Sequence, residues 1–261
     1  MLTLFSAHLL LELMSGVLVG FTLGLIGGGG SILAVPLMVY LVGVKNPHVA
    51  IGTSALAVAI NALVGLAQHA RNHTVKWRCA GIFASCGIAG AFIGAAFGKT
   101  IDGKKLLLFF ALLMIGVGIL MLRGRHNVGC QGASCNKHNA PKVMGYGLGT
   151  GLLSGFFGIG GGFLIVPGLI ASTGMPILNA VGTSLVAVSA FGFSTALSYM
   201  LSGYIDWQLA ALFILGGALG SLFGTRTARR MSGSSNHLTT VFACIIFIVA
   251  IYMIWQGVQK L

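Results

Sequence analysis

Long apolar runs separated by short polar segments fill almost the whole chain. The apolar runs lie near residues 9–26, 31–44, 50–69, 79–98, 105–122, 143–157, 163–173, 180–201, 207–225 and 238–257. A bilayer core about 30 Å thick needs about 20 apolar residues per helix. A membrane β-barrel would alternate polar and apolar residues, and these runs do not. The pattern predicts an all-α, polytopic membrane protein, whose first span begins within residues 1–11 rather than after a cleavable signal peptide.

Composition narrows the class further. Of the 261 residues, 56% are hydrophobic and 7% are charged, whereas a soluble domain has about 25% charged residues. The chain carries 15 Lys and Arg against 3 acids, a balance that in other proteins suggests nucleic-acid binding. The basic residues lie outside the apolar runs, apart from Lys105, which is the first residue of the run 105–122. We therefore assign the positive charge to loops that meet water and membrane lipid, and we expect no nucleic-acid partner.

Two of the apolar stretches are interrupted by glycine runs. Residues 9–44 contain the run 27–30, and residues 143–173 contain the run 158–162. As one continuous helix the first stretch would be roughly 50 Å long, which exceeds the bilayer thickness. Glycine unwinds helices, and unwound backbone persists inside a membrane only where protein buries it or where it lines a cavity. Each run predicts a broken helix at a buried site, with a packing kink as the alternative.

The two breaks belong to an internal repeat. Residues 24–36 match residues 155–167 at seven of 13 positions, and residues 50–58 match residues 180–188 at six of nine, at offsets of 131 and 130. The second offset also pairs Trp77 with Trp207. We predict two homologous repeats, 1–122 and 143–261, joined by a polar linker, 123–142. The repeats together form about eight transmembrane helices, and the first helix of each is broken by glycine.

Breaks at matching places in two halves are typical of secondary transporters, which bind substrate near the bilayer midplane. The N–H groups at the start of a half-helix bind anions. The Thr-Ser pair that follows each break can cap a helix or donate its hydroxyls to a ligand. We predict a substrate site composed of Gly27, Gly28, Gly29, Gly30, Ser31, Thr53, Ser54, Gly158, Gly160, Gly161, Gly162, Thr183 and Ser184.

The doubled glycine break, followed in each half by A-x-G-T-S at 50–54 and 180–184, resembles the TauE/SafE family of sulfite exporters. The stretch 46–54 is similar to the first-repeat pattern of that family, and the resemblance covers about residues 9–257. It implies a multi-pass protein of the bacterial inner membrane that exports a small anion, sulfite or an organosulfonate. The second copy departs from the first, with Ile159 at the place of Gly28 and Gly162 at the place of Ser31.

We expect a transporter rather than an enzyme, with no cofactor. Two alternatives stay open, a small-solute channel and a non-transporting membrane subunit. Glu12 is the only acid inside an apolar run, which makes it a candidate for proton coupling.

The linker contains four residues that are able to bind zinc, namely His126, Cys130, Cys135 and His138. A disulfide between the two linker cysteines, or neither role, is the alternative. Outside the linker, Cys79, Cys86 and Cys244 are expected to be small apolar residues of the spans.

The spaced glycines at 87–94 and 217–224 predict close helix packing rather than a ligand site. Orientation is open at this stage. If each break lies within one of eight alternating spans, the loops on the two sides of the membrane carry seven and eight basic residues. The positive-inside rule then favours neither orientation. If the chain re-enters at the breaks, this count changes and the repeats could be inverted.

Overall fold

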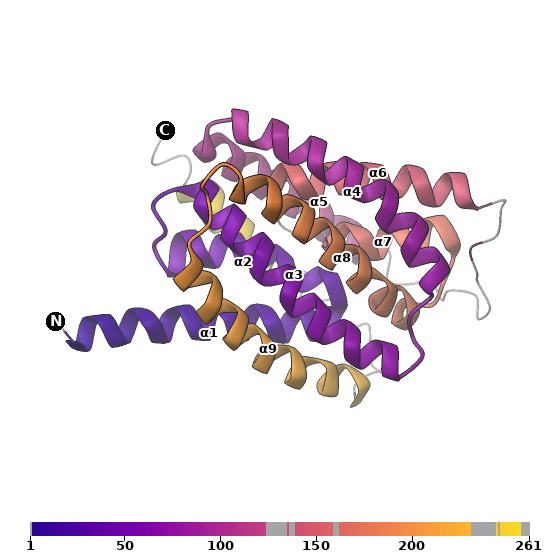
Figure 1. Ribbon diagram of the computed structural model, residues 1–261, viewed down its shortest axis with the longest axis horizontal. Helices are drawn as coiled ribbons and strands as arrows, with labels where there is room; N and C mark the ends of the chain where they lie inside the picture. Colours follow the sequence, from indigo (N-terminus) through magenta and orange to yellow (C-terminus); the bar gives the residue numbers. More distant parts are fainter. Residues whose placement is uncertain are drawn as a thin grey trace.

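The computed structural model describes residues 2–123, 135, 139–158, 162–230, 244 and 246–256, and these form helices and loops without strands. Five described helices are long and apolar enough to cross a membrane, within α3 (Pro47–Arg71), α4 (Trp77–Thr100), α5 (Gly103–Arg123), α8 (Ile177–Met200) and α9 (Trp207–Arg230). The all-α, multi-pass prediction is confirmed at this level. In Figure 1 α1 (Leu2–Ile26) runs along the long dimension of the molecule, and α3, α8 and α9 are inclined to it.

Capping residues explain where several helices begin. Asn46 accepts the backbone N–H of His48 through its side chain, and Pro47 occupies the first turn of α3, where a missing N–H costs nothing. Asp102 and Asp206 accept N–H groups at the starts of α5 and α9. Two of the three acids in the chain are therefore helix caps, and Glu12 is the remaining one.

At each described glycine break the chain turns back on itself. α1 (Leu2–Ile26) is followed by a short, irregular helical segment made of η1 (Gly27–Leu33), α2 (Ala34–Pro36) and η2 (Leu37–Leu41). Gly27 has φ +71°, and Gly30 packs directly on the backbone of Thr22 and Leu23. The hydroxyl of Thr22 also lies 3.4 Å from the carbonyl oxygen of Gly30. The first segment is thus a helical hairpin: the helix is broken at the glycine run, as predicted, and the chain re-enters there, which is the alternative that the sequence left open.

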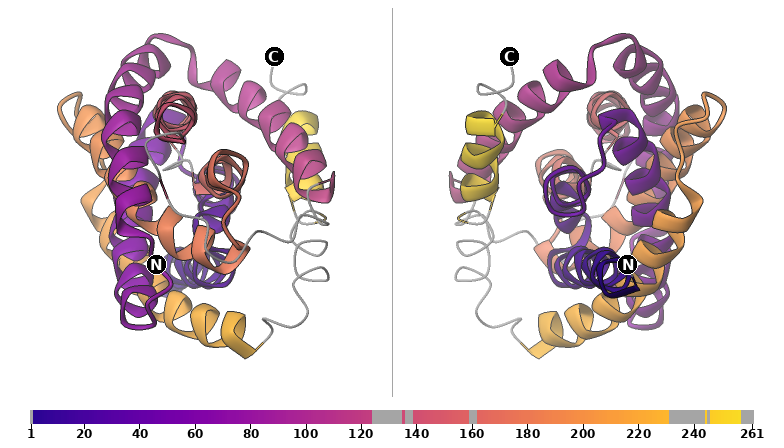
Figure 2. Two further views of the ribbon diagram at one scale, coloured as in Figure 1. Left: turned by 90° about the vertical axis from the view of Figure 1, so that its right-hand side faces the viewer. Right: turned by 90° about the vertical axis from the view of Figure 1, so that its left-hand side faces the viewer.

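The second break has the same form. α6 (Ala140–Phe157) ends at Gly158, which has φ +66° and donates its N–H to the carbonyl of Ser154. A glycine in this left-handed conformation is a common helix C-cap. α7 (Gly162–Thr173) then returns along α6. η1–η2 and α7 are mostly buried, and Figure 2 shows them inside a ring of longer helices.

The centre of the bundle is an antiparallel pair, α3 and α8. Gly52, near the start of α3, lies against Tyr199, near the end of α8, whereas Gly182 lies against His69 at the other end. Gly192 contacts Ala59 near the middle. Because the sequence matches α3 with α8, these contacts relate the two halves by a reversal of direction. An antiparallel α3–α8 pair is what inverted repeats would produce.

Two parallel pairs flank the centre, α1 with α9 and α4 with α6. Across the first pair a glycine Cβ would overlap the partner backbone at Gly16, Gly20, Gly24, Gly216, Gly220 and Gly224. Across the second pair the same holds at Gly90, Gly94, Gly98, Gly147, Gly151 and Gly155. In Figure 1 α1 and α9 run side by side along the lower edge. The packing function of the glycines in 87–94 and 217–224 is therefore confirmed.

A disulfide joins Cys79, in the first turn of α4, to Cys135 of the linker, with the Cα atoms 5.4 Å apart. The expectation that Cys79 is a free apolar residue was wrong, and so was the linker-internal Cys130–Cys135 pairing. Cys86 and Cys244 are free thiols. The bond fastens the linker to the end of the bundle where α3 ends and α4 begins, which we call the linker end. The opposite end, where α1 and α3 begin, is the N-terminal end.

Candidate functional site

The two glycine breaks lie at opposite ends of the central pair. Gly27 lies against Val181, beside the first turn of α8, and Gly158 lies against Ile51, beside the first turn of α3. Val181 is level with His69, and the 18 residues from Ile51 to His69 span about 27 Å of helix. One small anion cannot contact both breaks at this separation. Gly27 and Gly158 therefore do not hold one anion between them, although the segments that follow them, η1 and α7, contact each other.

The two predicted threonines make matching cross-links between the halves. Thr53 Oγ1 accepts the N–H of Asp206 at 3.0 Å, and Thr183 Oγ1 accepts the N–H of Lys76 at 3.0 Å. Both hydroxyls are fully buried. Each bond fixes the start of a central helix to the loop before α9 or α4, so the two threonines have a structural role at opposite ends of the bundle.

The predicted serines are also buried. Ser54 and Ser184 donate to the carbonyls of Ile51 and Val181, three residues earlier in their own helices. Ser31 lies in η1 with no exposed surface, and η1 contacts α1, α7, α3 and α8. The first break thus lies where elements of both halves meet.

The remaining glycines of the breaks are only partly described. Gly28 and Gly29 lie within η1, and Gly162 is the first residue of α7. Gly160 and Gly161 lie outside the described residues. Of the second break, the structure therefore places the two flanking glycines, Gly158 and Gly162.

Glu12 is half-buried on α1. The adjacent residue, Leu13, contacts Gly216 of α9, so the carboxyl group lies within the length of the α1–α9 pair rather than beyond its end. Its candidacy for proton coupling stays a prediction.

The linker candidates for zinc are His126, Cys130, Cys135 and His138. Three of them lie outside the described residues, and Cys135 is in the disulfide. Among the described part of the chain, no three His, Cys, Asp or Glu residues come together to hold a metal ion.

The structure brings together a set of polar residues that the sequence did not single out as a site. We name them the polar seam: Asn61 and Gln68 on α3, and Ser221 and Thr225 on α9. The Asn61 amide fills the space beside Gly217, Ser221 Oγ lies close to Gly65, and the Thr225 hydroxyl bonds to Gln68 Oε1. The matched positions in the other half are Phe191, Ser198, Ala91 and Ala95. This loss of repeat symmetry is the signal that would have identified the seam.

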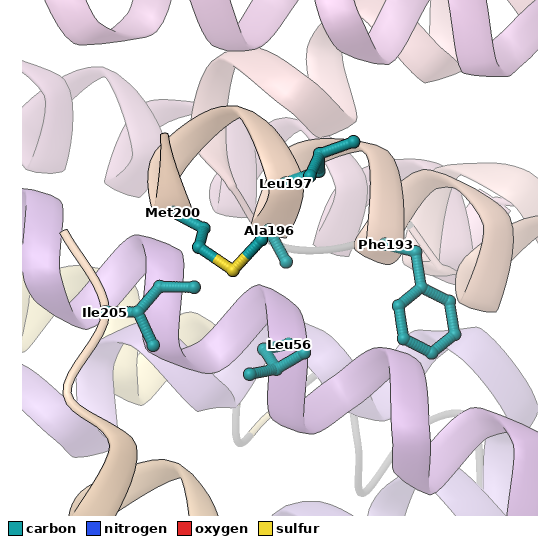
Figure 3. Close-up of a pocket in the computed structure, with 6 residues that line it drawn as sticks. All are labelled: Leu56, Phe193, Ala196, Leu197, Met200 and Ile205. Atoms are coloured by element: carbon teal, nitrogen blue, oxygen red, sulfur yellow. The ribbon is translucent and has the colours of Figure 1, made fainter. Parts of the chain in front are cut away.

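A pocket of about 230 Å³ lies elsewhere, between α3 and α8 (Figure 3). Its lining side chains are all apolar: Leu56, Phe193, Ala196, Leu197, Met200 and Ile205. Such a surface offers an anion no hydrogen-bond donor, so the pocket is a hydrophobic depression and not a polar substrate site.

Comparison with known proteins identifies the family. The model of the sulfite exporter TauE/SafE family matches residues 12–253. The chain belongs to the TauE/SafE family. The resemblance carried by the two glycine breaks and the Gly-Thr-Ser motifs is therefore confirmed.

The relatives of this TauE/SafE chain have the same extent. A probable membrane transporter protein of Xylella fastidiosa (strain 9a5c) is 52% identical over 257 residues, covering 95% of this chain and 96% of its own length. The probable membrane transporter protein YunE of Bacillus subtilis (strain 168) is 26% identical over 264 residues, covering 93% and 96%. No solved structure matches the chain. Family membership and the long apolar helices make it a multi-pass membrane transporter.

Proposed function

We propose that this TauE/SafE transporter exports a small oxyanion, sulfite or an organosulfonate, across the bacterial inner membrane by secondary transport. The family description supports sulfite as the substrate class. The composition of the buried interior supports an anion.

The observation that carries the proposal is the kind of polar group buried among the helices. The buried polar residues of the described chain are Ser, Thr, Asn and His, with no Asp, Glu, Lys or Arg. Hydroxyl and amide groups donate hydrogen bonds to an oxyanion, and half-buried Glu12 is the one acidic side chain of the described residues on a membrane helix away from the helix caps. The lack of a fixed positive charge keeps binding weak enough for release, which transport requires.

The glycine breaks keep a part in the proposal as separate half-sites. Helix ends carry partial charges that interact with ions. Because the two breaks lie near opposite ends of α3, we propose that each interacts with the anion at a different stage of transport. The break at Gly27 then acts near the linker end, and the break at Gly158 acts near the N-terminal end.

The inverted arrangement suggests the conformational change. The α1–α9 and α4–α6 pairs touch backbone to backbone at their glycines, so each pair moves as one unit. We propose that the two pairs move in turn against the central α3–α8 pair, opening first one end and then the other. Inverted repeats in other transporters support alternating access in this way.

A proteoliposome flux assay tests the proposal. The purified full-length chain is reconstituted, and uptake of sulfite and of taurine is measured with and without a pH gradient, beside protein-free liposomes. We expect saturable flux that a gradient stimulates, and loss of this stimulation in Glu12→Gln if that carboxyl couples protons. Non-saturating flux would indicate the channel alternative. No flux above protein-free liposomes with either substrate would contradict the proposal.

Orientation follows from where the helices place the basic residues. In the described chain the linker end carries Arg71, Lys76, Arg78, Arg123, Lys142, Arg226, Arg229 and Arg230, and the N-terminal end carries Lys45, Lys99, Lys104 and Lys105. The positive-inside rule favours a cytoplasmic linker end, which we propose. The Cys79–Cys135 disulfide is evidence for the opposite orientation, with the linker end in the periplasm, because disulfides persist in oxidising compartments.

Labelling decides between the two orientations. A membrane-impermeant thiol reagent is applied to intact cells that carry Asn72→Cys or Ser202→Cys in a background without free cysteines. We expect Ser202→Cys, at the N-terminal end, to be labelled. Labelling of Asn72→Cys instead would reverse the proposed orientation.

A further inference from the structure

The polar seam runs from the middle of α3 toward the linker end. Asn61 is near the centre of the 25-residue helix, and Gln68 is three residues from its end. Ser221, which lies beside Gly65, and Thr225, which bonds to Gln68, follow one another by one turn on α9, so the seam has successive levels about 6 Å apart. It is a continuous polar column about 10 Å long between two membrane-spanning helices.

Three atoms of the seam have no hydrogen-bond partner among the described residues: Asn61 Oδ1, Gln68 Nε2 and Ser221 Oγ. Asn61 and Ser221 have no exposed surface at all. Asn61 makes one long bond, from Nδ2 to the carbonyl of Phe213 at 3.5 Å. Buried polar groups are nearly always paired, and exceptions require an explanation. A transmembrane interior is an especially unfavourable place for them.

The chemistry of the seam fits an oxyanion. An amide NH₂ and a hydroxyl both donate, and the seam contains no carboxylate and no basic side chain. Neutral donors at successive levels of the seam are able to bind the oxygen atoms of a sulfite or sulfonate group as it passes along the column. Protein sites for hard divalent cations normally contain carboxylates beside amide carbonyls, and the seam contains no carboxylate.

The packing around the seam allows it to open. α9 contacts α1 backbone to backbone through glycine, whereas it contacts α3 through the polar side chains of the seam. Moving the α1–α9 pair away from α3 therefore separates the seam without breaking the tight glycine contact. The same movement uncovers Asn61 and Ser221 from the linker end.

We propose that the polar seam is the anion-binding part of the transport pathway, with Asn61 and Ser221 binding the oxyanion near the midplane and Gln68 and Thr225 contacting it on the way to the linker end. This inference rests on the proposed anion transport. It goes beyond that proposal by locating the site on α3 and α9 and not between the glycine breaks.

The test uses sulfite flux through the full-length chain in proteoliposomes. Asn61→Leu keeps the size of the side chain and removes its donors, and Ser221→Ala copies Ala91 at the matched position. We expect each variant to raise the KM for sulfite at least tenfold. Asn61→Asp is nearly isosteric and adds a negative charge, so it should abolish sulfite flux while the protein stays folded. Thr195→Val is the matched control, because Thr195 also has a buried hydroxyl without a described partner but lies outside the seam.

The outcomes separate this inference from the function on which it rests. If Asn61→Leu and Ser221→Ala both transport sulfite with the KM of the wild type, the proposed role of the seam is overturned, while the proposed anion transport stands. Absence of saturable flux in the wild type would overturn the proposed function itself. Equal KM increases in Thr195→Val would also overturn the seam, because they would show a general packing effect. If Asn61→Leu does not purify as a folded protein, Ser221→Ala, which removes one oxygen atom, carries the test.

Discussion

Between α3 and α9, Asn61 faces Gly217, whereas between α8 and α4, Phe191 faces Gly87 at the matched position. The backbones are arranged alike at the two places, with a glycine that leaves room for one large side chain. The side chains that fill the two places differ. Phe191 stacks on Phe83, with the ring centroids 6.2 Å apart. Asn61 leaves an amide oxygen unpaired among the described residues. The comparison teaches that positions matched in the sequence share their packing, and we propose that departures from the sequence match mark the chemistry.

The largest expected effect concerns the close glycine contacts that both helix pairs have. In Gly20→Leu and in Gly151→Leu the new side chain would overlap backbone atoms of the partner helix. The two backbones are already in contact at these glycines, so no space remains for a leucine side chain. We therefore expect no monodisperse protein from either variant in size-exclusion chromatography. Gly145→Leu on α6 has open space at its Cβ and should behave as wild type. A folded Gly20→Leu beside an unfolded Gly151→Leu would show that the two pairs are not equivalent.

The next effect concerns the apolar side of the comparison. Phe191→Asn copies the polar residue into α8, where it loses the contact with Phe83 and buries an amide without a partner. Loss of a buried Phe side chain costs about 3–5 kcal/mol, so we expect a large fall in thermal stability in detergent. Phe191→Leu should show a clearly smaller fall. Equal stability of Phe191→Asn and the wild type would mean that the α8–α4 contact tolerates polarity, and the contrast between the halves would disappear.

The disulfide is another difference between the two halves, and we expect its effect on thermal stability to be intermediate. Cys79 is bonded to Cys135, and Leu209 stands at the position that matches Cys79. Disulfides typically stabilise by about 2–4 kcal/mol, so a reductant should lower the melting temperature of the oxidised wild type. Cys79→Leu, which copies Leu209, should melt at the temperature of the reduced wild type and should not respond to the reductant. A response of Cys79→Leu to the reductant would assign the effect to other cysteines.

The smallest effect should be equal in the two halves. Thr53→Val and Thr183→Val each remove the acceptor for one backbone N–H. A buried hydrogen bond contributes about 1 kcal/mol net, so each variant should lose a similar, small amount of thermal stability and keep its sulfite KM. A large KM change in either would restore the threonines to the substrate site, as the sequence alone suggested.

Much of the fold was predictable because apolar length and repeat symmetry are written directly in the sequence. The runs 50–69 and 79–98 became α3 and α4 with ends displaced by two or three residues. The hairpins were not predictable, because a glycine run is compatible with a kink, an unwound segment or a reversal. The positive φ of Gly27 and Gly158 is a result of tertiary packing.

The candidate site was less predictable than the fold. Thr53 and Thr183 were selected because they are repeated, yet their repetition reflects the matching cross-links at Asp206 and Lys76. Asn61 and Ser221 were not selected because they are not repeated, and single polar residues in apolar runs do not show which helix they face. Cys79 and Cys135 are 56 residues apart, so their pairing depended on the docking of the linker.

The central claim is that the anion path follows the polar seam and not its apolar counterpart. The most direct test measures the KM for sulfite in proteoliposomes for two matched variants, Asn61→Leu and Phe191→Leu, beside the wild type. We predict at least a tenfold increase for Asn61→Leu and a change of no more than about twofold for Phe191→Leu. Equal KM changes in the two variants, or no change in Asn61→Leu, would contradict the claim.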